Sequence, residues 1–290
     1  MDDFQILPLP RRLAPMSQDL PKFSIIVVCY NEAGRIAATL KSCIGQDYAN
    51  REIIVVDGAS DDGSVELIQS FADHLHAFSS EPDRGIYDAM NRGLGMASGD
   101  FVCFMNGGDA FFDESVLSSV AGKIGSNRGT TWVGRSRVTA DTEEWDVPPK
   151  DVNFGQWAHN GVPHHQAVFY PRSFALQNRY DMTIGHAADT DFTLLAFENC
   201  GFAFADVTVA RFFLGGASNN FRRFSSAWKA TQTRLNVIRR HPGWFSVRFT
   251  AAYLIGPLAA CTIYKTLGAS RLEKMRQKKS KSAITDETIN

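Results

Sequence analysis

Residues 23–64 read FSIIVVCYNEAGRIAATLKSCIGQDYANREIIVVDGASDDGS and indicate the fold class most directly. The runs FSIIVVC and EIIVVD are rich in β-branched residues and have the length of buried strands. Between them, apolar residues recur at the spacing of one helix face, at Ile36, Leu40, Cys43 and Ile44. Two apolar strands joined by a helical crossover are typical of a parallel sheet.

The same alternation continues as far as residue 106. The sequence predicts a helix from about residue 64 to residue 71, a short strand at HAFSS, a helix at GIYDAMNRGLGMAS and a strand at DFVCFMN. This order favours an α/β fold with a doubly wound, mainly parallel sheet that helices cover on both faces. Residues 131–163 show no regular pattern, after which strand, helix and strand signals return in HQAVFY, DTDFTLLAFENCG and AFADVTVARFF.

The composition indicates a folded protein whose charge is unevenly distributed. Of the 290 residues, 44% are hydrophobic and 21% are charged, which are ordinary values for a globular chain. Residues 1–206 carry 15 Lys and Arg against 28 Asp and Glu, whereas residues 207–290 carry 15 against 3. A basic end of this kind suits contact with an anionic membrane or a nucleic acid, and the plain alternative is a solvated pair of basic helices.

Two further features bear on the compartment. The five cysteines form no C-x-x-C pair, and three of them lie inside apolar runs, as expected for buried thiols in a reducing environment. The opening segment MDDFQILPLPRRLAP begins with acidic residues and is interrupted by prolines, unlike a signal peptide. We therefore expect a cytoplasmic protein.

Polar clusters follow three of the predicted strands, and ligands of open α/β sheets bind beyond the carboxyl ends of the strands. Asp57 either accepts hydrogen bonds from a nucleobase or ribose or starts a turn. We assign function to Asp57 and helix capping to Asp61 and Asp62. The three clusters are Tyr30-Asn31-Glu32, the segment from Asp57 to Asp62, and the segment from Asn106 to Asp109.

Asp109 is a hard oxygen ligand at the end of a strand. Because waters and substrate phosphates complete the shell of Mg²⁺, one protein carboxylate is often enough, and Asp109 is a candidate ligand for Mg²⁺ or Mn²⁺. Gly107 and Gly108 let a phosphate or a sugar approach the backbone closely. Taken alone, a tetrapeptide of this kind is more often a turn than a metal site.

Two common nucleotide-binding classes are disfavoured. The sequence contains no G-x-x-x-x-G-K-[ST], and GLGMASG has the wrong glycine spacing for a dinucleotide fingerprint. That segment also precedes a predicted strand instead of following one. A kinase or a dehydrogenase is therefore an unsuitable interpretation.

The quoted segment, followed by DRGIYDAMNRGLGMASGDFVCFMNGGD, resembles the nucleotide-binding half of family 2 glycosyltransferases of the GT-A fold. Within that group it is similar to bacterial enzymes that build capsule, exopolysaccharide and O-antigen sugars. The similarity covers roughly residues 23–220. It implies a nucleotide-sugar donor, a divalent metal (Mg²⁺ or Mn²⁺) and inversion at the anomeric carbon.

The resemblance also implies roles for individual residues. Asp109 matches the metal ligand of the Asp-x-Asp region, although Asn106 and Gly108 stand where other members often have carboxylates. This departure leaves weak or dispensable metal binding open. The residues that match the nucleotide-binding positions are Tyr30, Asn31 and Glu32 in the first loop and Asp57 at the base or ribose.

A catalytic base is expected on a later helix. HAADTDF resembles the family segment in which an Asp opening a helix takes the proton of the acceptor hydroxyl, and Asp189 stands at the matching position. Asp191 lies two residues on and points elsewhere on a helix. The plain alternative for Asp189 is a first-turn charge at the amino end of a helix. Because proton abstraction near neutral pH is favoured by a raised carboxylate pKa, we expect a closed apolar site that raises the pKa of Asp189.

Two residues are candidates for lining the donor site. Asp88 and Asn91 lie on one face of a predicted helix. Asp88 with Arg92 is equally compatible with an ordinary i, i+4 ion pair.

Two further segments are candidates for positioning the substrates. His165 and Gln166 resemble a family HQ pair on the floor of the acceptor side, and the other histidines match no zinc spacing. Gly215, Gly216 and Ser218 either offer backbone amides and a hydroxyl to the diphosphate or form a flexible turn.

The basic end of the chain suits a lipid-borne acceptor. Residues 249–264 form an uncharged run of 16 residues, short of the roughly 20 needed to span a bilayer. Flanking basic residues suit an interfacial segment on anionic lipid, and a core helix or a homodimer contact is the alternative. The expected divisions are an amino-terminal arm (1–22), a GT-A domain (23–220) with a nucleotide-binding half (23–112) and an acceptor half (113–220), a helical, possible membrane-associated region (221–270) and a basic tail (271–290).

We therefore expect an inverting, metal-dependent, hexosyltransferase-like enzyme, peripheral at the inner face of the cytoplasmic membrane. It would move a sugar from a nucleotide-sugar donor, with a UDP-sugar as the first expectation, to a lipid-linked or saccharide acceptor in cell-surface polysaccharide synthesis. No nucleic acid is expected as a partner. The alternative is a non-catalytic sugar- or nucleotide-binding protein derived from a glycosyltransferase. A sugar-nucleotide pyrophosphorylase is disfavoured because CYNEAGR is not the long, Gly-rich, basic loop expected after its first strand.

Overall fold

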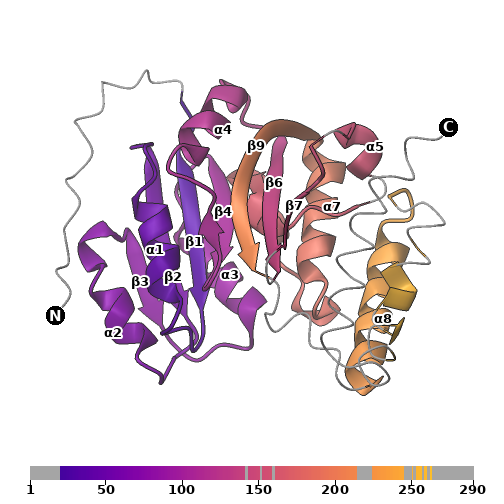
Figure 1. Cartoon of the computed structure of the whole chain (residues 1–290), viewed down its shortest axis with the longest axis horizontal. Coiled ribbons are helices and arrows are strands. Elements are labelled where there is room, and N and C mark those ends of the chain that lie inside the picture. Colours follow the sequence, from indigo (N-terminus) through magenta and orange to yellow (C-terminus); the bar gives the residue numbers. More distant parts are fainter. Residues whose placement is uncertain are drawn as a thin grey trace.

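The computed structural model describes residues 20–140, 143–150, 152–158, 161–213 and 224–244, together with residues 250, 253–256, 258–259 and 262. Within this part of the chain, nine strands form one sheet in the order β3-β2-β1-β4-β8-β6-β9-β5, and the ninth strand, β7, pairs with the later residues of β6, from Ser136 to Ala140 (Figure 1). The α/β fold with a mainly parallel first half is therefore confirmed.

The first half of the sheet consists of four parallel strands. Their register places the last residues of neighbouring strands together, because Cys29 pairs with Asp57 and Val28 pairs with Asn106. The carboxyl ends of these strands therefore meet at one edge, as the sequence predicts. The strands are β1 (Phe23–Cys29), β2 (Arg51–Asp57), β3 (Ala77–Ser80) and β4 (Phe101–Asn106), and the helices between them are α1 (Ile36–Ile44), α2 (Ser64–Gln69) and α3 (Ile86–Met96).

Helices cover both faces of this half (Figure 1). Alternate side chains of β1 point to opposite faces: Ile26 and Val28 pack in the cluster that contains α3 residues, whereas Ile25 and Val27 pack with α1 residues. Every residue of β1 is buried. This two-sided burial explains why the strand is a continuous apolar run instead of an alternating one.

The second half of the sheet is mixed. Residues 131–163, which show no regular pattern in the sequence, contain β6 and β7, and β6 pairs with β7, β8 and β9. Strand HQAVFY is shorter than predicted, since its first three residues form the 3₁₀ turn η2 (His165–Ala167). The elements are β5 (Ala110–Phe111), α4 (Val116–Ile124), β6 (Thr131–Ala140), β7 (Glu143–Val147), α5 (Phe154–Ala158), β8 (Val168–Pro171), α6 (Arg172–Asn178), η3 (Met182–Ile184), α7 (Ala188–Cys200) and β9 (Phe202–Phe213).

Helix α8 (Phe224–Arg240) lies in the region 221–270, which was predicted to be helical, and packs against α7 at one end of the molecule (Figure 1). In the part of the chain that the structure describes, no helix is long and apolar enough to cross a membrane. Residues 253–256, in the same region, are also helical. Several predicted features lie outside the described residues: most of the amino-terminal arm, the basic tail, and Gly215, Gly216 and Ser218. The domain limits stay a prediction.

Candidate functional site

The loops that follow β1, β2 and β4 lie side by side. Gly58 donates its backbone N–H to the carbonyl oxygen of Cys29 at 2.9 Å, and Gly107 donates to the carbonyl oxygen of Val28 at 2.8 Å. The polar clusters after β2 and β4 therefore both contact the end of β1. The three predicted clusters form one polar edge of the sheet.

Asp57 is fully buried at this edge. Its carboxylate accepts hydrogen bonds from the Ser60 backbone N–H at 2.9 Å and from the Ser80 hydroxyl at 2.7 Å. Burial favours a raised pKa, but the hydrogen bonds from Ser60 and Ser80 outweigh it and the pKa of Asp57 lies below its usual value. Asp57 thus fixes the loop as an ionised acceptor, and its contact with a nucleotide stays a prediction.

The loop after β1 is tied to the loop after β2. Asn31 has a φ of +53°, its N–H donates to the Ser60 hydroxyl at 2.8 Å and its side-chain oxygen accepts from the Asp61 N–H at 3.1 Å. The ring of Tyr30 is 62% exposed at the same edge. An exposed aromatic ring beside ordered polar groups is suited to contact with a base, which agrees with the nucleotide-binding role that the resemblance implies for this loop.

The capping prediction for the next two acidic residues is only partly correct. Asp62 accepts the backbone N–H of Ser64, the first residue of α2, at 3.0 Å, although Gly63 occupies the cap position itself. Among the described contacts, Asp61 donates its backbone N–H to Asn31 in the loop after β1, and its carboxylate does not cap the helix.

The turn from Asn106 to Asp109 is fixed by a side chain of α1. The hydroxyl of Thr39 accepts the Gly108 N–H at 2.9 Å and donates to the Asp109 carbonyl oxygen at 2.7 Å. Gly108 has a φ of +98°, and a Cβ there would lie 3.2 Å from the guanidinium of Arg35. Glycine therefore satisfies both the backbone conformation and the close approach at this turn.

The carboxylate of Asp109 is buried and accepts a hydrogen bond from Gln166 Nε2 at 2.6 Å. Burial raises the pKa of Asp109 to about 6, against opposing contributions from Gln166 and from the nearby His165. The side-chain oxygen of Asn106 is also buried and has no hydrogen-bond partner among the described residues. A buried carboxylate that is costly to ionise, beside an unpartnered amide oxygen, fits a divalent cation.

The protein ligands at this point are few. Among the described residues, no group of three or more His, Cys, Asp or Glu side chains is placed to bind a metal ion. One carboxylate and one amide oxygen leave most of an octahedral shell to water and to substrate oxygens. The donor set thus fits a metal that binds together with a diphosphate, as the sequence analysis predicts for Mg²⁺ or Mn²⁺.

Asp189 lies in the first turn of α7, with its side chain 32% exposed. It accepts the Thr190 N–H at 2.7 Å, and its Oδ2 atom lies 3.4 Å from His165 Nδ1. The expected rise in the pKa of Asp189 is wrong: burial favours it, but the contact with His165 outweighs burial and lowers the pKa. Asp191 points elsewhere, as predicted, with its Oδ1 atom 3.0 Å from His241 Nε2.

The short turn η2 brings the two carboxylates into one site. His165 contacts Asp189 and the next residue, Gln166, contacts Asp109. The predicted metal ligand and the predicted base, 80 residues apart in sequence, are therefore connected through two consecutive side chains. This arrangement suits a site in which one carboxylate faces a diphosphate and the other faces an attacking hydroxyl.

Two predicted donor-site residues make intramolecular contacts instead. Asp88 forms ion pairs with Arg84 at 2.8 Å and with Arg92 at 3.4 Å. Asn91 exchanges hydrogen bonds of 2.9 and 2.8 Å with the backbone of Tyr180. Both side chains thus have structural partners, and their contact with a donor stays a prediction.

Sequence reasoning missed three residues of this edge. Thr39 lies inside an amphipathic helix, and no local pattern marks it as the residue that fixes the Asp109 turn. The ion pair of Arg35 with Glu32, at 2.7 Å, was readable from its i, i+3 spacing. Tyr87 lies beside Asp189, its hydroxyl donates to the His186 carbonyl oxygen at 3.2 Å, and burial raises its pKa.

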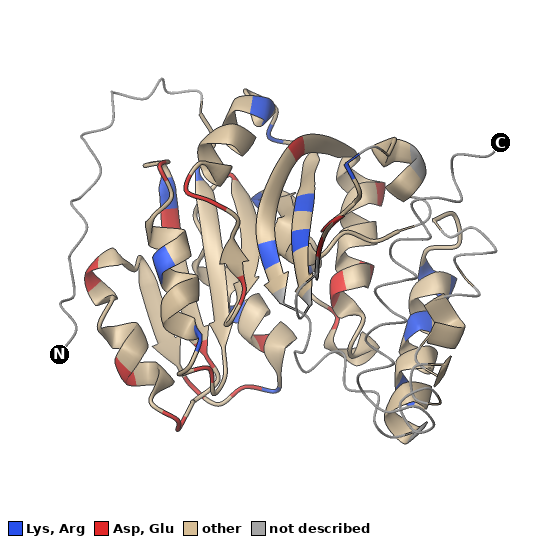
Figure 2. Ribbon diagram, in the orientation of Figure 1, with Lys and Arg blue, Asp and Glu red and all other residues tan. Residues whose placement is uncertain are grey.

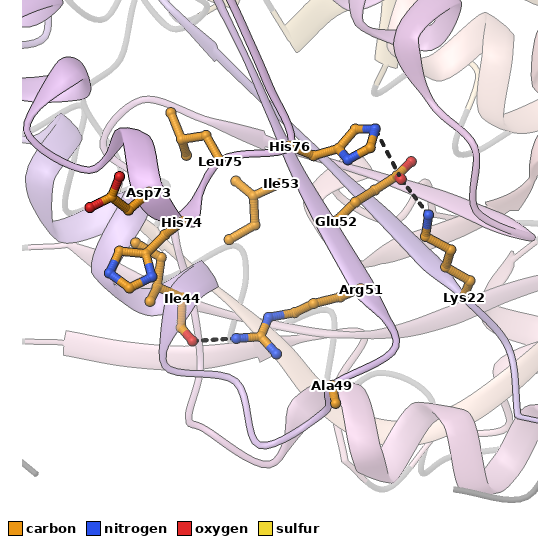
Figure 3. A pocket seen from close by; sticks show the side chains of 10 residues that line it. All are labelled: Lys22, Ile44, Ala49, Arg51, Glu52, Ile53, Asp73, His74, Leu75 and His76. Atoms are coloured by element: carbon orange, nitrogen blue, oxygen red, sulfur yellow. Dashed lines mark hydrogen bonds and ion pairs between the residues drawn. The ribbon is translucent and has the colours of Figure 1, made fainter. Parts of the chain in front are cut away.

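A hollow of about 390 Å³ lies at the amino ends of β1 and β2, the edge of the sheet opposite to the polar one (Figure 3). Lys22 Nζ lies 2.5 Å from Glu52 Oε2, His76 Nε2 lies 3.6 Å from the same oxygen, and Arg51 donates to carbonyl oxygens of α1. Burial opposes ionisation of Glu52, but its hydrogen bonds lower the pKa to about 2. Because these charges are paired within the chain, we do not assign the hollow to a substrate.

Comparison with protein families and curated proteins identifies relatives of the whole arrangement. The model of "Glycosyl transferase family 2" matches residues 24–197. A PGL/p-HBAD biosynthesis glycosyltransferase of Mycobacterium bovis is 31% identical over 206 residues, which cover 69% of this chain and 80% of the relative. An uncharacterized glycosyltransferase of Mycobacterium tuberculosis is 30% identical over 243 residues, which cover 81% of this chain and 91% of the relative.

Solved structures with the same fold include two proteins bound to nucleotide sugars. S. aureus TarS 1-349 in complex with UDP-GlcNAc has a TM-score of 0.63 at 18% identity, covering 84% of this chain and 73% of that one. Mannosyltransferase PcManGT from Pyrobaculum calidifontis, in complex with GDP-Man and Mn²⁺, has a TM-score of 0.61 at 18% identity, covering 95% and 84%. These likenesses establish the GT-A-like fold of the chain.

Proposed function

The chain belongs to glycosyl transferase family 2, and on that premise we propose that it is an inverting glycosyltransferase. It moves a sugar from a nucleotide-sugar donor, with a UDP-sugar as the first candidate, to a saccharide or lipid-linked acceptor in cell-surface polysaccharide synthesis. The observation that carries the proposal is the pair of carboxylates, Asp109 and Asp189, connected through His165 and Gln166.

Asp189 acts on the acceptor in this proposal. Its partly exposed carboxylate takes the proton of the acceptor hydroxyl while that oxygen bonds to the anomeric carbon. The bond between the anomeric carbon and the diphosphate oxygen breaks on the opposite face, and the electron pair leaves with the diphosphate. Attack from the face opposite to the leaving group inverts the anomeric configuration.

The polar edge binds the donor. Asp109, with Asn106 beside it, would hold Mg²⁺ or Mn²⁺, which neutralises negative charge on the departing diphosphate when bound. Gly107 and Gly108 allow the diphosphate to approach the backbone. The exposed ring of Tyr30 contacts the base, while Asn31, Glu32 and Asp57 order the loop around it.

The carboxyl-terminal part supplies contact with an anionic membrane surface. Helix α8 carries basic residues and no acidic ones (Figure 2). Trp228 on α8 is 49% exposed and Ile255 is 59% exposed, and the segment with Ile255 lies against α8 because Thr231 donates to the Leu254 carbonyl oxygen at 3.1 Å. Exposed apolar side chains among cations suit peripheral binding to anionic lipid. A homodimer through the same surface is the alternative.

Nucleotide binding tests the donor site. We expect calorimetry with UDP, GDP, dTDP and CDP to show binding of one nucleotide that depends on Mn²⁺ and is lost in Asp109→Ala. Asp189→Asn should keep that binding and lose sugar transfer. A wild-type protein that binds the nucleotide but transfers no sugar would instead support the alternative, a non-catalytic sugar- or nucleotide-binding protein.

Sedimentation with vesicles tests the membrane contact. Binding to vesicles that contain phosphatidylglycerol, but not to pure phosphatidylcholine, should weaken in Trp228→Ser. Ile86→Ser is the matched control, because Ile86 is 43% exposed on α3 and far from α8 in sequence. Equal binding of both variants, or concentration-dependent dimers without vesicle binding, would contradict this part of the proposal.

A further inference from the structure

His165 contacts Asp189 at the site and is the more buried of the two side chains. Its side chain is only 9% exposed, whereas that of Asp189 is 32% exposed. The Nδ1 atom of His165 lies 3.4 Å from Asp189 Oδ2, a distance at which catalytic contacts are often found before substrate binds. The other ring nitrogen, Nε2, is buried and has no hydrogen-bond partner among the described residues.

The unpartnered nitrogen determines where the imidazole carries its proton. A neutral imidazole has one N–H, on either nitrogen. A buried N–H without an acceptor costs about 1–3 kcal/mol, so an N–H at Nε2 is disfavoured. An N–H at Nδ1, by contrast, has an acceptor in the Asp189 Oδ2 atom, 3.4 Å away. His165 is therefore a donor to Asp189.

From this geometry we infer that His165 is a positioning residue for the catalytic base: its Nδ1–H orients the Asp189 carboxylate and stabilises its ionised form. The inference rests on the proposed function, in which Asp189 takes the proton of the acceptor. Asp189 is the member of the pair that faces substrate, because Nε2 of His165 has no access to solvent. His165 acts on the reaction through Asp189.

Five further ionisable groups interact with Asp189, and all five are uncharged at neutral pH. Burial raises the pKa of each tyrosine among them and lowers the pKa of His164 to about 4. Among the described contacts, the donors to the carboxylate are His165, the Thr190 backbone N–H at 2.7 Å and the Thr190 hydroxyl at 3.5 Å. The surrounding groups are Tyr87 on α3, His164 before η2, Tyr170 on β8, Tyr180 after α6 and Tyr253 in the carboxyl-terminal segment.

Two conservative substitutions separate the donor role from simple packing. In His165→Asn the amide nitrogen takes the place of Nδ1, whereas in His165→Gln it takes the place of Nε2. We expect His165→Asn to keep most of the transfer rate and the acid limb of the wild-type pH profile. His165→Gln should lower kcat by about tenfold or more and move the acid limb to higher pH, with the donor KM nearly unchanged.

The neighbouring residue provides a matched control. Gln166→Leu removes the contact with Asp109 from the same turn, so it should weaken Mn²⁺-dependent nucleotide binding without changing the pKa of Asp189. Equal rates and equal pH profiles for His165→Asn and His165→Gln, in variants that unfold in urea like the wild type, would overturn the inference.

A second measurement does not depend on activity. The Asp189 carboxyl carbon is titrated by ¹³C NMR in the wild type and in both His165 variants. We expect a higher pKa for Asp189 in His165→Gln than in His165→Asn. The same pKa in all three proteins would overturn the inference, whereas a wild type that binds no nucleotide would count against the proposed function alone.

Discussion

Replacing Asp109 with Asn is expected to stabilise the metal-free protein. Asp109 is 8% exposed, and burial raises its pKa from 3.8 to about 6. A group whose pKa rises on folding favours the folded state below its unfolded pKa, and this contribution is lost as pH rises through the folded pKa. At about 1.36 kcal/mol per pKa unit, the ionised carboxylate costs about 3 kcal/mol at pH 8 but only about 1 kcal/mol at pH 4.5.

Urea unfolding in the presence of a chelator measures this effect. The Asn side chain has the shape of Asp and keeps an acceptor for Gln166, so the change removes the charge and little else. Asp109→Asn should exceed the wild type in unfolding free energy by up to about 3 kcal/mol at pH 8 and by about 1 kcal/mol at pH 4.5. Saturating Mn²⁺ with the matching nucleotide should stabilise the wild type and leave the variant unchanged.

Asp61→Asn is the control, because Asp61 is exposed at the same edge and the charge change is identical. Its effect should stay within about 0.5 kcal/mol at either pH. A variant Asp109→Asn that is no more stable than the wild type at pH 8, or that gains equally at pH 4.5, would refute the view that burial of this charge is costly without a cation.

Three further predictions concern stability. Gly93→Ala should lower the unfolding free energy in urea by about 1–3 kcal/mol, because the new Cβ would lie 2.4 Å from the Cγ2 atom of Ile26 on β1. Gly95→Ala, in the same helix α3, places its Cβ in open space, so it should instead raise the unfolding free energy by about 0.5–1 kcal/mol. The pKa of Glu52 is lowered to about 2 in the folded protein, and the stability that a lowered carboxyl pKa provides is lost as the pH falls. Glu52→Gln should therefore lower the unfolding free energy in urea by about 3 kcal/mol at pH 7 and by about half of that at pH 3. Burial favours a lowered pKa for His241, but the hydrogen bonds that its ring donates to the carboxylates of Asp191 and Glu198 raise it. Its stabilising effect on the folded state should therefore be present at pH 6 and be lost as the pH rises through this raised pKa, a pH dependence of the unfolding free energy in urea that His241→Gln abolishes.

Strand β6 and the turn that holds Asp109 depend on contacts between residues that are far apart in the sequence, and no local sequence pattern shows such contacts. Arg135 and Arg137 interrupt the apolar pattern of β6, and in the structure they form ion pairs with Asp206 on β9 and Asp146 on β7. These partners lie outside β6, so the sequence of this segment shows no regular strand pattern. Thr39, which fixes the Asp109 turn, was missed for the same reason.

The sequence by itself determined the order of strands and helices in the first half, because buried strands and amphipathic helices carry their periodicity in neighbouring residues. It also determined which edge is polar, since parallel strands bring their carboxyl ends together. Only the tertiary structure decided the ionisation of the two central carboxylates. Burial raises the pKa of Asp109, while the contact with His165 lowers that of Asp189, the reverse of the expected rise. Desolvation and contacts between distant residues exist only once the chain has folded, and they set the properties of the site.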